Sequence, residues 1–232
     1  MIFEAEFWMS LATIIMIDIV LAGDNAVVIA LASRNLPLQQ RNKAILWGTF
    51  GAIIVRILMT LGAVWLLRIP FLQAIGGLLL LIVAIKLLKS GDDSENIKAE
   101  TGLMQAIRTI IIADIIMGVD NVLAIAGASQ GNMLLVVIGL AISIPIVVWG
   151  SKWIVTLMDR FPVIVQIGAL ILAWTSGTMI VHDQMVGELA LAQWGWLSWV
   201  IHAFTLGLVL LFIFFQQRAK RAQIKPDVQN VV

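Results

Sequence analysis

The sequence predicts an all-α polytopic membrane protein with seven transmembrane helices, arranged as two inverted three-helix repeats plus one extra C-terminal helix. Three observations predict this fold class: a very apolar composition, seven apolar stretches of membrane-spanning length, and an internal repeat that carries the same acidic motif in both halves. Of the 232 residues, 61% are hydrophobic and only 12% are charged, whereas soluble proteins carry roughly 25% charged residues. A soluble protein of this composition could not cover its surface with polar groups, so the membrane class is favoured.

Seven stretches are long and apolar enough to cross a bilayer, which needs about 20 residues per helix. They are expected near residues 7–32, 45–67, 70–88, 103–128, 133–152, 162–181 and 195–215. Pro37, Pro70 and Pro162 lie at or near the expected helix ends, where a missing N–H does least harm. Pro145 falls inside the fifth span, so we expect it to kink that helix or to leave a carbonyl free.

The spans divide into two halves around one clearly hydrophilic segment. The expected organisation is a first three-helix repeat at 7–90, a cytoplasmic linker at 91–102, a second, inverted three-helix repeat at 103–182, a seventh helix at 195–215 and a cytoplasmic tail at 216–232.

The two halves share a motif that contains rare residues for a membrane span. Residues 13–33 align with residues 109–129 without a gap, and 11 of the 21 positions are identical. Identities among Ile and Ala weigh little, because apolar membrane segments match one another by chance. The weight lies on the aligned polar residues, which are Asp18 with Asp114, Asp24 with Asp120, and Asn25 with Asn121.

The match resumes further along, where RIPFLQAIGGLLLL at 68–81 aligns with RFPVIVQIGALILA at 160–173. Each half therefore contains three spans. Because three is odd, the second half must enter the membrane from the opposite side. Related halves of opposite topology are the architecture of many secondary transporters, whose site lies at the midplane between the halves.

The basic residues predict the orientation of the chain. If there are seven spans, 13 of the 15 Lys and Arg residues fall on one side: Arg34, Arg41, Lys43, Lys86, Lys89, Lys98, Arg108, Lys152, Arg160, Arg218, Lys220, Arg221 and Lys225. The opposite side has Arg68 alone among basic residues, with several acids. By the positive-inside rule, the N-terminus is expected outside and the C-terminus in the cytoplasm.

Four aspartates lie in these apolar spans: Asp18, Asp24, Asp114 and Asp120. An ionised carboxylate near the bilayer centre costs at least about 2.5–3.5 kcal/mol. Arg56 is the only basic residue deep in a span, and we expect it to neutralise one aspartate at most. Four mirrored carboxylates with so little compensation indicate a functional site.

Helix geometry refines this expectation. In a straight helix, Asp18 and Asn25 share a face, whereas Asp24 points about 120° away. Gly23 and Gly118 are expected to allow local unwinding, which would turn both acids of a repeat toward one cavity and free backbone carbonyls as ligands. The expected metal site consists of Asp18, Asp24, Asn25, Asp114, Asp120 and Asn121, with Arg56 as the compensating charge.

Carboxylate and amide oxygens suit Mg²⁺, Ca²⁺ and Mn²⁺. Thiolate sites are excluded because the chain has no cysteine, and zinc usually takes His or Cys. His182 and His202 lie outside the motif, and we interpret them as interfacial. A thioether ligand would favour Mn²⁺, and Met117 lies beside the second motif. Four carboxylates with one Arg and one divalent cation leave a charge of −1, which a coupled proton would neutralise.

Three segments of the chain resemble the TerC family of integral membrane proteins, and within it the short bacterial YjbE/YkoY-type members. They are LAGDNAVVIALAS (21–33), MGVDNVLAIAGAS (117–129) and WGTFGAIIVRI (47–57), and the resemblance extends over about residues 7–215. It implies a seven-span fold related to the LysE-like exporters, a bacterial cytoplasmic (inner) membrane location and, for several members, manganese efflux. It also implies that the intramembrane acidic motifs of the family fall on Asp18, Asp24, Asn25, Asp114, Asp120 and Asn121.

We therefore expect a secondary transporter, and not an enzyme, that exports Mn²⁺ from the cytoplasm coupled to proton entry. Mn²⁺ is then the transported substrate, and no prosthetic group is expected. The sequence contains no G-x-x-x-x-G-K loop, so we do not expect this chain to bind and hydrolyse ATP to drive transport.

Other functions stay open at this point. The same scaffold would also suit Ca²⁺, Mg²⁺ or protons alone, and a membrane partner that supplies metal to secreted proteins would need no net transport. An enzyme with paired intramembrane aspartates that activate water is disfavoured, because no second motif for that chemistry is visible. The expected partners are the divalent cation and the lipid bilayer, and a homo-oligomer and a secretion-linked protein are left open. Nucleic acid is not expected, because the net charge is +1 and no basic patch alternates with aromatic residues.

Overall fold

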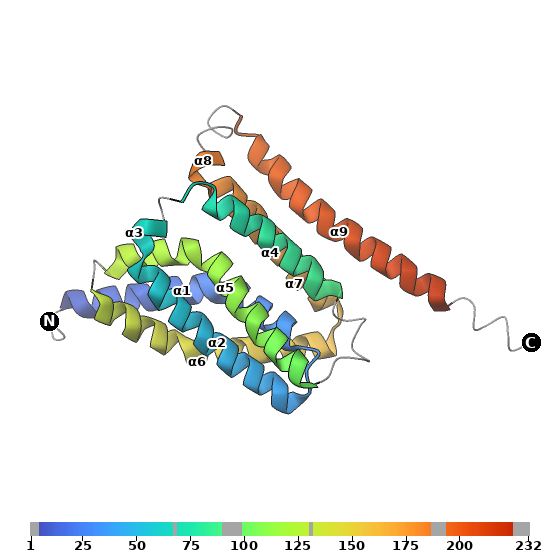
Figure 1. Ribbon diagram of the computed structural model, residues 1–232, viewed down its shortest axis with the longest axis horizontal. Coiled ribbons are helices and arrows are strands. Elements are labelled where there is room, and N and C mark those ends of the chain that lie inside the picture. Colours follow the sequence, from blue (N-terminus) through green and yellow to red (C-terminus); the bar gives the residue numbers. More distant parts are fainter. Residues whose placement is uncertain (1–4, 67–68, 90–98, 130–131, 187–193, 225–232) are drawn as a thin grey trace, which may run out of the picture.

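The computed structural model of the chain describes residues 5–66, 69–89, 99–129, 132–186 and 194–224. Within these ranges all regular secondary structure is helical, and there is no strand. The helices are α1 (Ala5–Ser33), α2 (Leu38–Leu61), the short α3 (Ala63–Leu66), α4 (Leu72–Lys89), α5 (Ala99–Ser129), α6 (Met133–Arg160), α7 (Val163–His182), the short α8 (Gln184–Val186) and α9 (Leu197–Ile224) (Figure 1).

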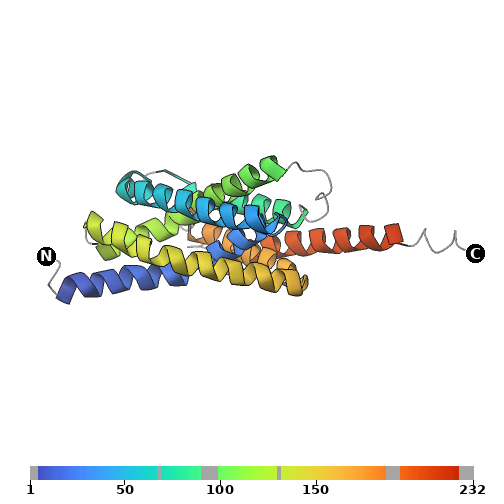
Figure 2. The same cartoon turned by 90° about the horizontal axis from the view of Figure 1, so that it is seen from below.

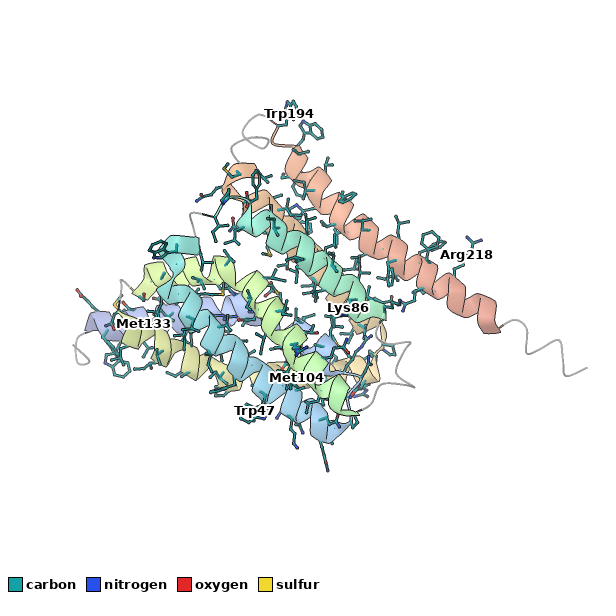
Figure 3. All side chains as sticks on the ribbon, in the orientation of Figure 1. Trp47, Lys86, Met104, Met133, Trp194 and Arg218 are labelled. Carbon is teal, nitrogen blue, oxygen red and sulfur yellow. The ribbon has the colours of Figure 1, made fainter. Side chains whose placement is uncertain are left out.

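The described helices agree with the expected spans. Six of them are long and apolar enough to cross a membrane, and α1 makes a seventh if its two parts count as one span. The parts Glu6–Ile19 and Leu21–Ser33 meet at an angle of 43°. The helices are apolar around most of their circumference, as expected where lipid and not water surrounds them. Trp65, Trp149 and Trp199 are 71–75% exposed, and Trp47 and Trp194 lie at the periphery of the bundle (Figure 3).

Several boundaries differ from the expected ones. The second span begins at Leu38, directly after Pro37, and α6 continues to Arg160 instead of ending near Lys152. One lysine does not stop a helix in an apolar run, and α6 ends only where Pro162 restricts the backbone before it. α6 also runs through Pro145 as one continuous helix.

The expected linker and tail are partly helical. Residues 99–102 already belong to α5, and residues 216–224 belong to α9. The rest of the linker, at 91–98, and the end of the tail, at 225–232, lie outside the described residues.

The bundle is built from three extensive helix pairs, which are α1 with α6, α2 with α5, and α4 with α7. α1 and α5 also pack against each other, and α9 lies against α7 at one edge of the molecule (Figure 1). The start of α1 and the last turn of α9 lie at opposite ends of the molecule in both views (Figures 1 and 2). The largest buried cluster fills the space between α1, α4, α5, α6 and α7.

Two glycines let the paired helices approach closely. A Cβ at Gly48 of α2 would lie 2.7 Å from Ile110 Cδ1 of α5, and a Cβ at Gly139 of α6 would lie 2.5 Å from Ile14 Cγ2 of α1. Small residues at helix contacts are the usual means of close packing in membranes, where no hydrophobic effect drives helices together. The α1–α5–α2–α6 core that holds the acidic motifs is fixed in this way.

Candidate intramembrane cation site

Arg56 links the two halves of the acidic motif. This residue lies on α2, and its Nη1 donates to Asp18 Oδ1 of α1, whereas its Nη2 donates to Asp114 Oδ1 of α5. All three side chains are at most 8% exposed. The forked guanidinium of Arg56 contacts two aspartates, although its single positive charge neutralises only one, in agreement with the expectation. The cluster keeps a formal charge of −1 if both carboxylates are ionised.

A small chamber of about 20 Å³ lies beside this ion-pair cluster, and Asn25, Thr49 and Ser143 help to line it. Several buried polar atoms here have no hydrogen-bond partner among the described residues: Asn25 Oδ1 and Nδ2, Thr49 Oγ1, Arg56 Nε and Asp114 Oδ2. A chamber of this volume suits about one water molecule. It is too small for a hydrated divalent cation.

Asp24 faces a different and larger cavity of about 340 Å³. The lining residues are Leu21, Asp24, Met117, Asn121, Thr175, Thr178 and Met179. The Thr175 hydroxyl of α7 donates to Asp24 Oδ2 at 3.4 Å, and the backbone N–H of Asn25 donates to Asp24 Oδ1 at 2.9 Å. Among the described residues, no basic side chain forms an ion pair with Asp24. This carboxylate is therefore available to a mobile cation.

The six expected ligands do not gather in one place. Asp18, Asn25 and Asp114 line the chamber at Arg56, whereas Asp24 and Asn121 line the larger cavity. As predicted, the side chains of Asp18 and Asn25 lie on a common face of α1, and the side chain of Asp24 points away from them. The side chain of Asp120 lies outside the described part of the chain. In that part, no three His, Cys, Asp or Glu side chains are close enough to hold a metal ion.

The two glycines do not mark the expected breaks. Both α1 at Gly23 and α5 at Gly118 are helical, and the bend in α1 lies between Ile19 and Leu21. A glycine lowers the cost of unwinding but does not require it. In lipid, each freed backbone group costs several kcal/mol unless it finds another partner, so the intact helix is favoured.

Sequence reasoning missed the contribution of α7. Thr175, Thr178 and Met179 complete the larger cavity, yet α7 carries no acidic residue before its C-terminal end. The segment WTSGTM (174–179) held the only available signal, which is a cluster of hydroxyl side chains within an apolar span.

Comparison with known proteins places the whole chain among bacterial membrane proteins. It is 45% identical over 218 residues to the membrane protein YjbE of Bacillus subtilis (strain 168), covering 94% of this chain and 100% of YjbE. It is 27% identical to the membrane protein YkoY of the same organism, covering 81% of this chain and 64% of YkoY. The inner membrane protein YgdQ of Escherichia coli (strain K12) is 25% identical, over 78% of this chain and 83% of YgdQ.

No solved structure matches the chain. Residues 3–221 match the integral membrane protein TerC family, and this range contains both acidic motifs and all the long helices except the last three residues of α9. Together with the 45% identity to YjbE over nearly its full length, this match shows that the chain belongs to the TerC family of integral membrane proteins.

Proposed function

We propose that this protein is a secondary transporter that exports Mn²⁺ from the cytoplasm in exchange for protons. The observation that carries the proposal is the environment of Asp24, a carboxylate within a membrane-spanning helix that faces a cavity of about 340 Å³ and has no basic partner among the described residues. A charge in this position is costly in lipid. A cation that enters the cavity would offset that cost.

The lining of the cavity supports a divalent cation as the substrate. Asp24 and Asn121 offer a carboxylate and an amide oxygen from the two motif helices, and Asp120 neighbours Asn121 in the chain. Such oxygen ligands suit Mn²⁺, Mg²⁺ and Ca²⁺. The thioethers of Met117 and Met179, which also line the cavity, favour Mn²⁺ as the softest of the three.

The Arg56 cluster has a separate role in this proposal. Asp18 and Asp114 are both engaged by Arg56, so they act as a fixed charge near the metal cavity and not as its main ligands. The residual charge of −1 in their small chamber is the charge that a coupled proton neutralises.

Helix pairing supports an inverted repeat as the framework for alternating access. In an inverted repeat, α5 is the counterpart of α1, and α6 is the counterpart of α2. The pair α1–α6 then corresponds to the pair α5–α2, and both pairs are among the most extensive in the bundle. In the same way, the contact of Gly48 with Ile110 corresponds to that of Gly139 with Ile14. Secondary transporters commonly move such related halves against each other around a central site.

We further propose that the protein lies in the bacterial cytoplasmic membrane with its N-terminus outside. Arg41 at the start of α2 donates to Asp159 at the end of α6 at 2.7 Å, so these two helix ends share a side of the bundle. This is the side that the positive-inside rule assigns to the cytoplasm.

The proposal is tested with purified Asp24→Asn protein in proteoliposomes, with Asp159→Asn as the matched control. Asp159 is half exposed and lies at a helix end, so its loss leaves the cavity intact. We expect Asp159→Asn to retain Mn²⁺ flux and Asp24→Asn to lose at least about 90% of it, while both proteins remain monodisperse and helical.

Retained flux in Asp24→Asn would contradict the site assignment. Flux of Ca²⁺ or Mg²⁺ in preference to Mn²⁺ would keep the mechanism and change the substrate. If the wild type moves none of the three cations, transport itself is contradicted, and supply of metal to secreted proteins becomes the better account.

A further inference from the structure

His202 on α9 has contacts that an interfacial histidine would not need. Its ring lies 4.2 Å from that of Trp174 on α7, with the planes inclined by 43°. Its Nδ1 lies 2.8 Å from the carbonyl oxygen of Ser198, and its Nε2 lies 3.1 Å from Thr178 Oγ1. Both ring nitrogens are therefore engaged.

These contacts are compatible with both the neutral and the protonated imidazole ring of His202. The Ser198 carbonyl can only accept, so Nδ1 carries a proton, and Nε2 of the neutral ring must accept the proton of the Thr178 hydroxyl. In the protonated ring, Nε2 donates to Thr178 Oγ1, and the hydroxyl turns its own proton to the Trp174 carbonyl, which lies 3.2 Å away. The indole of Trp174 also stabilises a cation close to its face.

Thr178 connects this histidine to the cavity of Asp24, because the same side chain lines that cavity. Close approach of α7 and α9 maintains the connection. A Cβ at Gly177 would lie 3.0 Å from Thr205 Oγ1 and 3.3 Å from the Cα of His202, so the small residue at 177 brings the histidine against α7.

Few other charges act at this position. Across the cavity, the titratable group is Asp24. On the two helices that pack against α9, charged or titratable groups occur only at or next to the ends. They are His182 at the end of α7, Asp183 directly after it, Arg160 before it, and Lys86 and Lys89 in the last turn of α4. Within α9 itself, the first charged residue after His202 is Arg218.

We propose that His202 takes up a proton beside the metal cavity and thereby promotes release of the divalent cation. The inference rests on the proposed function. A positive charge on His202 repels a divalent cation at Asp24 and weakens its binding. Since His202 lies five residues after the start of α9, and that end faces outside in the proposed orientation, protons from outside would drive metal release there. The seventh helix then contributes to coupling and is more than a scaffold.

The test is the affinity for Mn²⁺ between pH 8.0 and 5.5 in the purified full-length protein, measured for the wild type, His202→Gln and His182→Gln. His182 is the matched control, because it is the only other histidine in the chain and is exposed at the end of α7. We expect the affinity of the wild type and of His182→Gln to fall at least about fivefold more over this pH range than that of His202→Gln. At pH 8.0 the three proteins should agree within about twofold.

An unchanged pH profile in His202→Gln would overturn the inference while leaving the proposed function in place. Absence of Mn²⁺ binding by the wild type at pH 8.0 would overturn the proposed function, and this inference with it. If His202→Gln does not fold, Thr178→Val removes the contact at Nε2 and keeps the ring. This variant should bind Mn²⁺ with a weaker dependence on pH than the wild type, because the imidazolium loses its acceptor. A dependence on pH equal to that of the wild type would overturn the inference.

Discussion

Arg56 is the residue on which the buried charge of this protein depends. One guanidinium satisfies Asp18 and Asp114 on two different helices, which holds α1, α2 and α5 together through charged hydrogen bonds. Removing one partner of a buried pair leaves an uncompensated charge, which costs far more than the intact pair contributes. The stability of the core should therefore depend on the balance of charge at this point more than on any single contact.

This balance predicts the effect of Arg56→Met. With two carboxylates left facing each other, we expect a loss of about 3–5 kcal/mol in the free energy of unfolding. Asp159→Asn, which removes a half-exposed partner of Arg41, should cost no more than about 1 kcal/mol. Thermal unfolding in detergent measures both. Combining Arg56→Met with Asp18→Asn and Asp114→Asn should restore most of the loss, and an Arg56→Met protein as stable as the wild type would refute the charge-balance argument.

At this scale the sequence predicts the polar residues but not their grouping. The repeat identifies Asp18, Asp24 and Asn25, and helical spacing turns Asp24 away from the other two, as the structure has them. The double contact of Arg56 could not be foreseen, because it depends on how close α1 and α5 come to α2. His202 belongs to no motif, so only the packing of α9 against α7 reveals its contact with Thr178.

At the scale of the helices, pairing depends on small residues that face large ones. Gly48 receives Ile110, and Gly139 receives Ile14, which is at the equivalent position of the other half. Both isoleucines are fully or almost fully buried. In a medium where lipid tails are as apolar as side chains, such steric fit is a main source of helix association.

A matched pair of glycines on α6 tests this account. A Cβ at Gly139 would lie 2.5 Å from Ile14 Cγ2, whereas a Cβ at Gly150 would have no neighbour within 4 Å. We expect Gly139→Ala to cost about 1–3 kcal/mol through overpacking. Gly150→Ala should be neutral or stabilising by up to about 1 kcal/mol, because alanine is the better helix former. The two effects are compared by measuring the unfolding temperatures of both variants and the wild type in detergent. Equal effects of the two substitutions would argue against steric pairing.

The helices themselves could be predicted from the sequence, because runs of apolar residues of sufficient length have few alternatives in lipid. The positions where the helices begin and end were harder to predict. α6 continues two turns past Lys152, since a charge at a membrane surface does not interrupt a helix. A break in α1 was expected at Gly23, whereas its axis bends between Ile19 and Leu21, because a glycine permits a break without requiring one.

For the whole molecule, orientation decides which ends of the helices face the side from which protons enter. In the proposed transport, the proton gradient sets the direction, and the orientation places His202 near the outer side. The start of α1 and the end of α9 lie at opposite ends of the bundle (Figures 1 and 2), which agrees with seven spans if the two parts of α1 count as one.

The orientation can be measured directly because the chain contains no cysteine. Gln39→Cys at the start of α2 and Gly195→Cys before α9 both introduce exposed thiols. In intact cells, a membrane-impermeant maleimide should label Gly195→Cys and should label Gln39→Cys only after permeabilisation. The reverse pattern would contradict the proposed topology and would place the start of α9, with His202, on the cytoplasmic side.

Movement of Mn²⁺ against its own gradient is the most direct measure of the central claim. Purified protein in proteoliposomes with equal Mn²⁺ on both sides should accumulate the metal in the compartment from which protons flow, and a protonophore should abolish the accumulation. The account predicts that Asp24→Asn removes this response while Asp159→Asn keeps it. Mn²⁺ that stays at equilibrium under an imposed pH gradient, in vesicles shown to hold folded protein, would contradict proton-coupled export.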